Sequence, residues 1–546
     1  MAGGDASGEW ELPRVRSSLF FEDDFKHITD DVGGDTEFFD VKFYPWNPQG
    51  SPEIFAAASK KHVLICRLQH TAQPNKNPCE IIRVIRDDDH DALDYSCTWS
   101  RDATTEAPLL CIGGRGNNVK VYDVIKGTLA LTLAGHGDGI IDLITSPANP
   151  LIIASASDDT TARIWSLDPV HSEQPCVGIL GGENHSWYLL SIVWHSLTRN
   201  KNDDRPANRF FFSLSLQAFH QTGRYILSAG HDRVISMTGM CLVSSLSRAL
   251  HSQCICSSVS FYGDNVLSRA CHEDCIVMWR IEGFSSHDPP PAALDAPTNY
   301  DPSQLTRSSF VRQTDTKSCP RPYTRLMTFH TKGCGVQFYM RFSMLQRKGM
   351  HPVLAFGNAG SKIMFWDMAR FTAYADYIQE LDKSEKEGSE EPKRPSWLEP
   401  RRQQRKKPTV GVVERPVSKL RTETSSSGRE LRREPTTSRA ASSARSTPVE
   451  TAPSVTSSRE LATREPTGPE ARTGWEEKYG ISDPNEPIKP HKVESFSASA
   501  VLARQVAWSM DGAWCVVAGS KNSVVILERW NPHKKDTTPV PKGSHR

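Results

Sequence analysis

The residues whose types and spacing come nearest to a metal site are Cys271 and Cys275, in the run Cys-His-Glu-Asp-Cys. A structural zinc ion takes four thiolate or imidazole ligands, usually supplied as two closely spaced pairs. No second pair of this kind stands at a ligand-like distance in the sequence. We therefore predict no metal site, and we expect these cysteines to be small hydrophobic residues within strands.

Phosphate binding is the next chemistry to consider, because Gly113-Gly-Arg-Gly116 is rich in glycine. A phosphate loop leads into a helix N-terminus, whereas this run leads into a strand-like segment. The sequence also lacks a nucleophile elbow, a metal-binding His pair and paired carboxylates on a common strand. These observations predict a protein that is not an enzyme and that carries no cofactor.

The composition restricts the class further. The chain has 546 residues with a formal net charge of +1, which argues against a surface devoted to nucleic acid. We expect no secretory leader and no membrane span, since no apolar run approaches ~18 residues. The 13 cysteines are accordingly expected to be reduced.

One segment repeats along the chain and indicates the fold. Its clearest copy runs from His136-Gly-Asp-Gly through Ser-Asp-Asp159 to Ile-Trp165. A Gly-His start, an Asp in the turn and a final Trp form the WD-repeat signature. The Asp can accept hydrogen bonds from backbone N–H groups and from the His, and a Ser or Thr hydroxyl can link the Asp to the indole N–H.

Seven copies predict an all-β, seven-bladed WD40 β-propeller, in which four-stranded blades stack around one axis. The expected blades cover residues 39–68, 93–124, 136–168, a fourth that starts at His185 and includes Tyr225–Asp232, 254–283, 323–369 and 496–531.

A long insertion separates blades six and seven. Residues 376–488 are rich in Ser, Thr, Pro, Glu and Arg and poor in large apolar residues, so we expect disorder. The predicted organisation is an N-terminal arm at 1–36, blades one to six at 37–375, this linker, blade seven at 489–532 and a tail at 533–546. Within the linker, Arg401–Lys407 is either a solvated charge run or a nuclear import signal or nucleic-acid contact.

Two further segments interrupt the repeat. Residues 193–217 divide blade four, and a second break follows Met237 and runs over about 238–249. The first begins with Val and ends with Gln, which suits a retained intron. We hypothesise that both are gene-model errors, and otherwise that they are surface insertions. Transcript sequencing decides between the two, because reads containing codons 193–217 in most messages would refute the hypothesis.

Apart from these interruptions, the chain resembles the EED/ESC family of WD-repeat Polycomb subunits, in the form of a fungal member. The matching runs include Tyr95-Ser-Cys-Thr-Trp99, Leu180-Gly-Gly-Glu-Asn-His185, Tyr262-Gly-Asp-Asn-Val-Leu-Ser-Arg, Phe338-Tyr-Met-Arg-Phe-Ser343 and Ala503-Arg-Gln505. The resemblance covers all seven expected blades but neither the linker nor the two breaks.

The resemblance implies an aromatic cage for trimethyl-lysine on a histone H3 tail. By family position the cage residues are Phe39, Tyr95, Phe338 and Tyr339, with Arg504 beside them. Phe338 replaces a Trp that is usual in animal members, which keeps a π face but reduces its area. A trimethylammonium is a diffuse cation without an N–H, so ring faces suit it through cation–π attraction of about 0.5–2 kcal/mol per contact.

The implied partners are a SET-domain histone methyltransferase, which such a reader stimulates, and other Polycomb subunits, in the nucleus. No membrane partner is expected, and contact with nucleic acid is expected only through Arg401–Lys407. The alternative is a WD-repeat adaptor without a methyl-lysine site, such as a ubiquitin-ligase or RNA-processing scaffold. The two differ in geometry, because only the first requires Phe39, Tyr95 and Tyr339 to surround one open pocket.

Overall fold

The computed structural model is built almost wholly of β-strands. It describes residues 11–20, 37–60, 62–70, 77–87, 93–180, 214–219, 221–222, 225–230, 235–239, 242–247, 256–271, 273–282, 284–287, 323–334, 337, 339–398, 469–497 and 500–529. The chain divides into one compact unit of residues 1–393 with 472–546 and a second of residues 394–471. No helix in these described ranges is long and apolar enough to cross a membrane.

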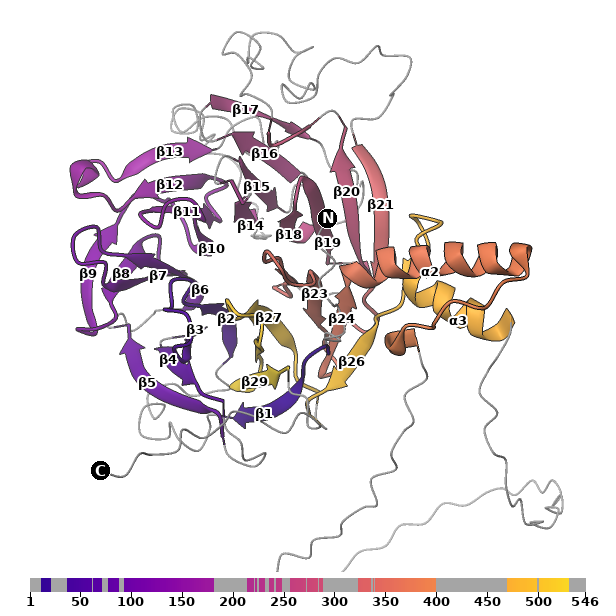
Figure 1. Cartoon of the computed structure of the whole chain (residues 1–546). Helices are drawn as coiled ribbons and strands as arrows, with labels where there is room; N and C mark the ends of the chain where they lie inside the picture. The colour runs from indigo at the N-terminus through magenta and orange to yellow at the C-terminus, as the bar shows by residue number, and fades with distance from the viewer. Residues whose placement is uncertain are drawn as a thin grey trace, which may run out of the picture. The chain divides into compact units, whose positions relative to one another are not determined.

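Within the first unit, the described strands form seven antiparallel sheets that follow one another around a central axis (Figure 1). We number the sheets in the chain order of their innermost strands. Sheet one is β2 (Phe38–Phe43), β3 (Glu53–Ser59), β4 (His62–Leu68) and β5 (Cys79–Arg86). Sheet two is β6 (Asp94–Arg101), β7 (Pro108–Gly114), β8 (Val119–Asp123) and β9 (Thr128–Leu133). Sheet three is β10 (Ile140–Thr145), β11 (Ile152–Ser157), β12 (Ala162–Ser166) and β13 (Cys176–Leu180), with the short helix η1 (Pro169–His171).

The other four sheets continue the order. Sheet four is β14 (Leu214–Phe219), β15 (Tyr225–Gly230), β16 (Ile235–Gly239) and β17 (Leu242–Ser247). Sheet five is β18 (Cys256–Tyr262), β19 (Asn265–Ala270), β20 (Cys275–Ile281) and β21 (Tyr323–His330), to which β25 (Pro487–Ile488) adds in parallel. Sheet six is β22 (Ser343–Leu345), β23 (Val353–Gly357), β24 (Lys362–Asp367) and β26 (Lys492–Ser495). Sheet seven is β27 (Ala503–Trp508), β28 (Trp514–Gly519), β29 (Ser523–Glu528) and β1 (Arg14–Phe20). The expected all-β WD-repeat propeller is confirmed.

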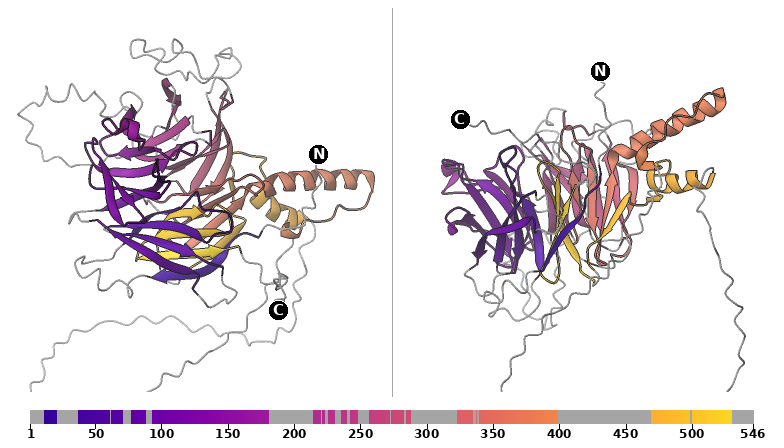
Figure 2. Two further views of the ribbon diagram at one scale, coloured as in Figure 1. Left: turned by 60° about the vertical axis from the view of Figure 1, so that its left-hand side comes forward. Right: turned by 60° about the horizontal axis from the view of Figure 1, so that its bottom comes forward.

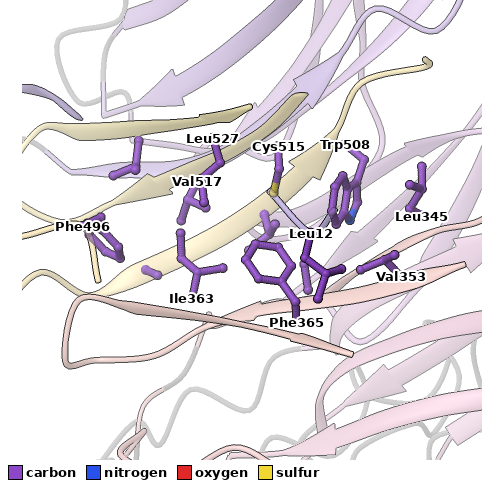
Figure 3. Close-up of a cluster of buried hydrophobic side chains, with 14 of the residues drawn as sticks. Leu12, Leu345, Val353, Ile363, Phe365, Phe496, Trp508, Cys515, Val517 and Leu527 are labelled. Carbon is purple, nitrogen blue, oxygen red and sulfur yellow. The ribbon is translucent and has the colours of Figure 1, made fainter. Parts of the chain in front are cut away.

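Apolar side chains pack between neighbouring sheets rather than in one central core. Between sheets six and seven, Ile363 and Phe365 of β24 face Trp508, Cys515 and Val517 of sheet seven (Figure 3). Each strand sends alternate residues to its two faces, and both faces meet another sheet. The stacked sheets therefore exclude water while leaving their innermost strands around the axis.

A chain of hydrogen bonds in sheet three confirms the role expected of the WD signature. His136 Nδ1 lies 2.8 Å from Asp159 Oδ2, and its Nε2 lies 2.6 Å from Ser155 Oγ. Trp165 donates its indole N–H to the same Ser155 hydroxyl at 2.7 Å. The hydroxyl thus links Trp165 to the His rather than directly to the Asp. Burial opposes ionisation of Asp159, but the bonds from His136 and from the Gly137 N–H outweigh it and lower the carboxyl pKa.

Three expected boundaries are wrong. Residues 14–20 are not a free arm, because β1 pairs with β29 as the fourth strand of sheet seven. Strand β21 belongs to sheet five and β26 to sheet six, although the sequence placed them in blades six and seven. The alternation of polar and apolar residues indicates that a segment is a strand, but it does not indicate which sheet that strand joins.

The break expected at 238–249 is also wrong for the residues that are described there. Thr238 pairs with Ile226 inside β16, and β17 then forms the fourth strand of the sheet. A missing Trp therefore does not end the strand, because backbone pairing does not depend on that side chain. Of the first break, residues 214–217 begin β14 and the remainder lies outside the described residues, so the intron hypothesis stays a prediction.

Helix α2 (Met368–Glu387) corrects the expected linker start at 376. The Asp367 side chain accepts the Ala369 N–H at its N-terminus, and Gly388 ends the helix with φ 63°. Phe371, Tyr374, Tyr377 and Leu381 recur at helical spacing and are buried. Helix α3 (Pro469–Tyr479) lies beside α2 (Figure 2), where the Tyr374 hydroxyl donates to Glu476 at 2.9 Å. The short helix η3 spans Ser396–Leu398.

His491 links this helical insertion to sheet six through two hydrogen bonds. Its Nδ1 accepts the Asp367 N–H at 3.0 Å, and its Nε2–H donates to the Lys478 carbonyl at 2.9 Å. The ring also packs 4.5 Å from that of Tyr479 and 4.9 Å from that of Phe371, centroid to centroid. Burial, with the nearby Arg370 charge, holds the His491 pKa well below its usual value.

Lowering the pH should therefore weaken the attachment of the helical insertion to sheet six. Between pH 7.5 and 5.5 the imidazole binds a proton when it is released from its site but not when it is packed there. The equilibrium constant of the packed over the released form therefore falls by up to about ten-fold. We expect hydrogen exchange of the α3 amides, corrected for the intrinsic effect of pH, to rise over this range. In the variant His491→Phe this extra dependence should vanish. A wild-type protein whose corrected exchange does not change with pH contradicts the assignment.

Candidate functional site

β-Bulges at the start of three innermost strands position three of the predicted site residues. The pairing register shifts between Phe38 and Asp40 in β2, and between Asp94 and Ser96 in β6. It shifts again between Ala503 and Gln505 in β27. The residues passed over are Phe39, Tyr95 and Arg504, each the second residue of its strand. A bulge turns its extra side chain away from the regular strand face, so these three emerge at the same end of the ring.

Tyr339 reaches the same place by another route. It lies four residues before β22, in a segment without regular pairing, and its φ is 55°. The left-handed region is unfavourable for a residue with a Cβ, so the surrounding structure must hold Tyr339 there. Met340, which follows it, is fully buried and anchors the segment.

The three described aromatic rings form one cluster. The ring centroids of Phe39 and Tyr95 are 5.5 Å apart with planes at 85°, and those of Tyr95 and Tyr339 are 6.4 Å apart at 16°. All three residues are partly exposed, so solvent reaches the cluster. Phe338, the fourth predicted cage residue, lies outside the described residues.

The charges around the cluster suit a cationic guest. The Arg504 guanidinium carbon lies 5.8 Å from the Phe39 centroid, and Arg504 donates to Glu37 at 2.9 Å. This ion pair compensates the arginine, which would otherwise repel a cation. Burial, followed by the neighbouring Tyr339, raises the pKa of the Tyr95 hydroxyl, so the ring stays a neutral phenol. The site therefore offers neutral π faces, with the Arg504 charge paired to Glu37.

A cluster of neutral aromatic rings is suited to binding a ligand rather than to catalysing a reaction. Within the described ranges, no group of three or more His, Cys, Asp or Glu side chains is placed to hold a metal ion. Cys271 is a buried free thiol and Cys275 a half-buried one, while His272 between them lies outside the described residues. The arrangement fits recognition of a diffuse, weakly hydrated cation through ring faces.

Sequence reasoning missed the polar residues beneath the cluster. Asp40, Ser96 and Asp142 each stand directly after the bulge of an innermost strand and are buried, and Arg341 reaches them from sheet six. The sequence repeat did contain a signal for these residues. When the innermost strands of the repeats are aligned, this position is polar in successive repeats. A buried polar residue facing the axis needs a partner there.

Comparison with known proteins gives a consistent result. Residues 127–166 match the family model described as WD domain, G-beta repeat. The Polycomb protein EED of Chaetomium thermophilum is 42% identical over 579 residues, covering 97% of this chain and 98% of that protein. The Polycomb protein esc of Drosophila melanogaster is 25% identical over 366 residues, covering 65% and 74%.

Solved structures agree with the sequence relatives. A chain in the crystal structure of the Chaetomium thermophilum polycomb repressive complex 2 superposes with a TM-score of 0.74 and 41% identity, covering 96% of this chain and 99% of that one. A chain in the structure of the same organism's complex with H3K27me3 and H3K27M gives a TM-score of 0.74 and 41% identity, covering 96% and 98%.

Proposed function

Since this chain belongs to the Polycomb EED family, we propose that it is a non-catalytic WD-repeat scaffold that reads trimethyl-lysine on a histone H3 tail. In this role it binds and stimulates a Polycomb-type SET-domain methyltransferase and so supports gene silencing in the nucleus. Other Polycomb subunits are its further partners. The bound state of the related complex, which contains H3K27me3, supports the choice of ligand.

The observation that carries the proposal is the convergence of Phe39 of sheet one, Tyr95 of sheet two and Tyr339 of the segment before sheet six. Their positions are 56 and 244 residues apart in sequence, counted from 39 to 95 and from 95 to 339. An aromatic residue kept for packing would meet the hydrophobic clusters between sheets, whereas these three rings are partly exposed and meet one another. Facing rings at a solvent-reached surface favour a bound cation.

We further propose that all seven sheets are blades of one ring, with sheet four closing it. Its innermost strand β14 packs against β10 of sheet three on one side and β18 of sheet five on the other. The insertion between blades six and seven then leaves at Asp367 and returns at His491. Of the expected linker 376–488, residues 376–398 and 469–488 are described and the remainder lies outside the described residues. Arg401–Lys407 lies outside the described residues, so a nucleic-acid contact through it stays a prediction.

A peptide titration tests the proposal. Purified full-length chain is titrated with fluorescent H3 tail peptides, one trimethylated at a single lysine and one unmodified, over several lysine positions. We expect tighter binding of one trimethylated peptide, and enhanced methylation when that peptide is added to a reconstituted methyltransferase complex. Equal binding of every peptide pair would favour the rival, a WD-repeat adaptor without a methyl-lysine site.

A further inference from the structure

We propose that Arg341 is the positioning residue of the aromatic cluster, which it holds by tying sheet six to sheet three across the central axis. The inference rests on the proposed function, because it explains how the reading site keeps its shape. It concerns Arg341 and the polar side chains that it contacts rather than the aromatic rings themselves.

Arg341 makes three hydrogen bonds that fix the segment carrying Tyr339. Its Nη1 donates to Asp142 Oδ1 at 3.1 Å, and its Nη2 donates to the Ile141 carbonyl at 3.0 Å. Its backbone N–H donates to the Arg504 carbonyl at 2.8 Å. One residue, two positions after Tyr339, thereby joins sheets six, three and seven.

The acceptor side of this bridge continues under the other two rings. Ser96 Oγ, next to Tyr95, donates to Asp40 Oδ2 at 2.8 Å and lies 3.3 Å from Asp142 Oδ1. Asp40 directly follows Phe39 and also accepts the Cys97 N–H at 3.1 Å. The network therefore includes the residue that follows Phe39 and the residue that follows Tyr95. Its third member, Arg341, follows Tyr339 by two positions.

The charges of the network are balanced and buried. Lys42 lies 3.4 Å from Asp40 and 3.9 Å from Asp142, so two basic side chains face two carboxylates. Burial opposes ionisation of Asp40, but Lys42 and Arg341 outweigh it and lower the carboxyl pKa. Arg341, Asp40 and Asp142 are each less than a tenth exposed.

Such a network fixes geometry more than it stabilises the fold. Removing two charges from water offsets much of their attraction, so a buried ion pair adds little net stability. A planar guanidinium with two separate acceptors nevertheless permits only one arrangement of the chain segments. The left-handed backbone at Tyr339 needs that restraint, because regular pairing begins only at Ser343.

The test compares four variants by peptide titration of the full-length chain. Arg341→Met should lower the ratio of trimethylated to unmodified affinity about ten-fold, because Tyr339 loses its fixed position. Arg341→Lys should lower it less, since an ammonium keeps the charge but not the two-pronged contact. Asp142→Asn keeps the size and an acceptor and should also give a partial loss. Arg347→Met is the matched control, because Arg347 is exposed six residues away, and should change nothing.

The affinity for the unmodified peptide separates positioning from a general structural effect. If Arg341 acts through Tyr339, Arg341→Met should weaken binding of the trimethylated peptide and leave binding of the unmodified peptide unchanged, whereas loss of fold weakens both. A ratio that stays at the wild-type value in Arg341→Met and Asp142→Asn overturns the inference while leaving the proposed function intact. A wild-type chain without any preference instead overturns the proposed function. Should Arg341→Met not fold, Asp142→Asn and the Lys variant still decide the question.

Discussion

Tyr95→Ala and Tyr339→Ala will each abolish the preference of this chain for a trimethylated over an unmodified histone H3 peptide. The two rings are nearly parallel with centroids 6.4 Å apart, and Tyr95 also meets the edge of Phe39. Each ring contributes about 0.5–2 kcal/mol of cation–π attraction, and losing one opens the site to water, which weakens the others. Titration with both peptides should give a ratio of dissociation constants near unity.

Two controls make the result specific. Tyr95→Phe keeps the ring and should retain most of the preference, since the hydroxyl is not a donor to a trimethylammonium. Tyr323→Ala removes a half-buried tyrosine of sheet five that packs on Trp279, and should leave the ratio unchanged. If both Tyr95→Ala and Tyr339→Ala keep the wild-type ratio, the cage is assigned to the wrong residues.

Deleting residues 1–20 will destabilise the propeller more than any single substitution discussed above. Leu12 is buried in the cluster between sheets six and seven, Val15 packs against the same cluster, and Leu19 packs against the cluster between sheets seven and one. At about 1.5–3 kcal/mol for each well-buried aliphatic side chain, the loss is on the order of 5 kcal/mol, comparable with the whole stability of many domains. The deletion also exposes the unpaired edge of β29, so thermal melting should fall steeply and aggregation should increase.

The matched control keeps the strand and removes an exposed charge. Arg14→Ala should change the unfolding free energy by less than about 0.5 kcal/mol, because the Arg14 side chain is 38% exposed in its contact with Glu11. A synthetic peptide spanning residues 11–20, added to the truncated chain, should raise the melting temperature again. An unchanged melting curve after the deletion would show that β1 does not close sheet seven.

The fold was largely predictable because its signal repeats. Alternating strands, the Asp159 turn and the Trp165 ending recur, and each copy reports the same supersecondary unit. Closure was not predictable, since residues 14–20 carry no mark of the sheet that they join at the far end of the chain. A strand partner more than 500 residues away depends on the geometry of the whole ring.

The candidate site was predictable only through family resemblance. Phe39, Tyr95 and Arg504 occupy bulges, and a bulge depends on the pairing of two strands that neither strand shows alone. The bridge from Arg341 to Asp142 spans the axis and could not be inferred before the sheets were placed. Helix α2 was missed for a different reason, because the polar composition after residue 376 hid the spacing of Tyr377 and Leu381.

The central claim is that ring faces hold a cation, and replacing the charge while keeping the shape tests it most directly. The histone peptide is prepared with trimethyl-lysine and with its uncharged isostere, in which carbon replaces the ammonium nitrogen. Both side chains fill the same volume, so the difference in affinity reports the cation–π attraction less the cost of removing the cation from water. We expect the charged peptide to bind about five- to thirty-fold more tightly to the full-length chain. Equal dissociation constants for the two peptides would contradict the account.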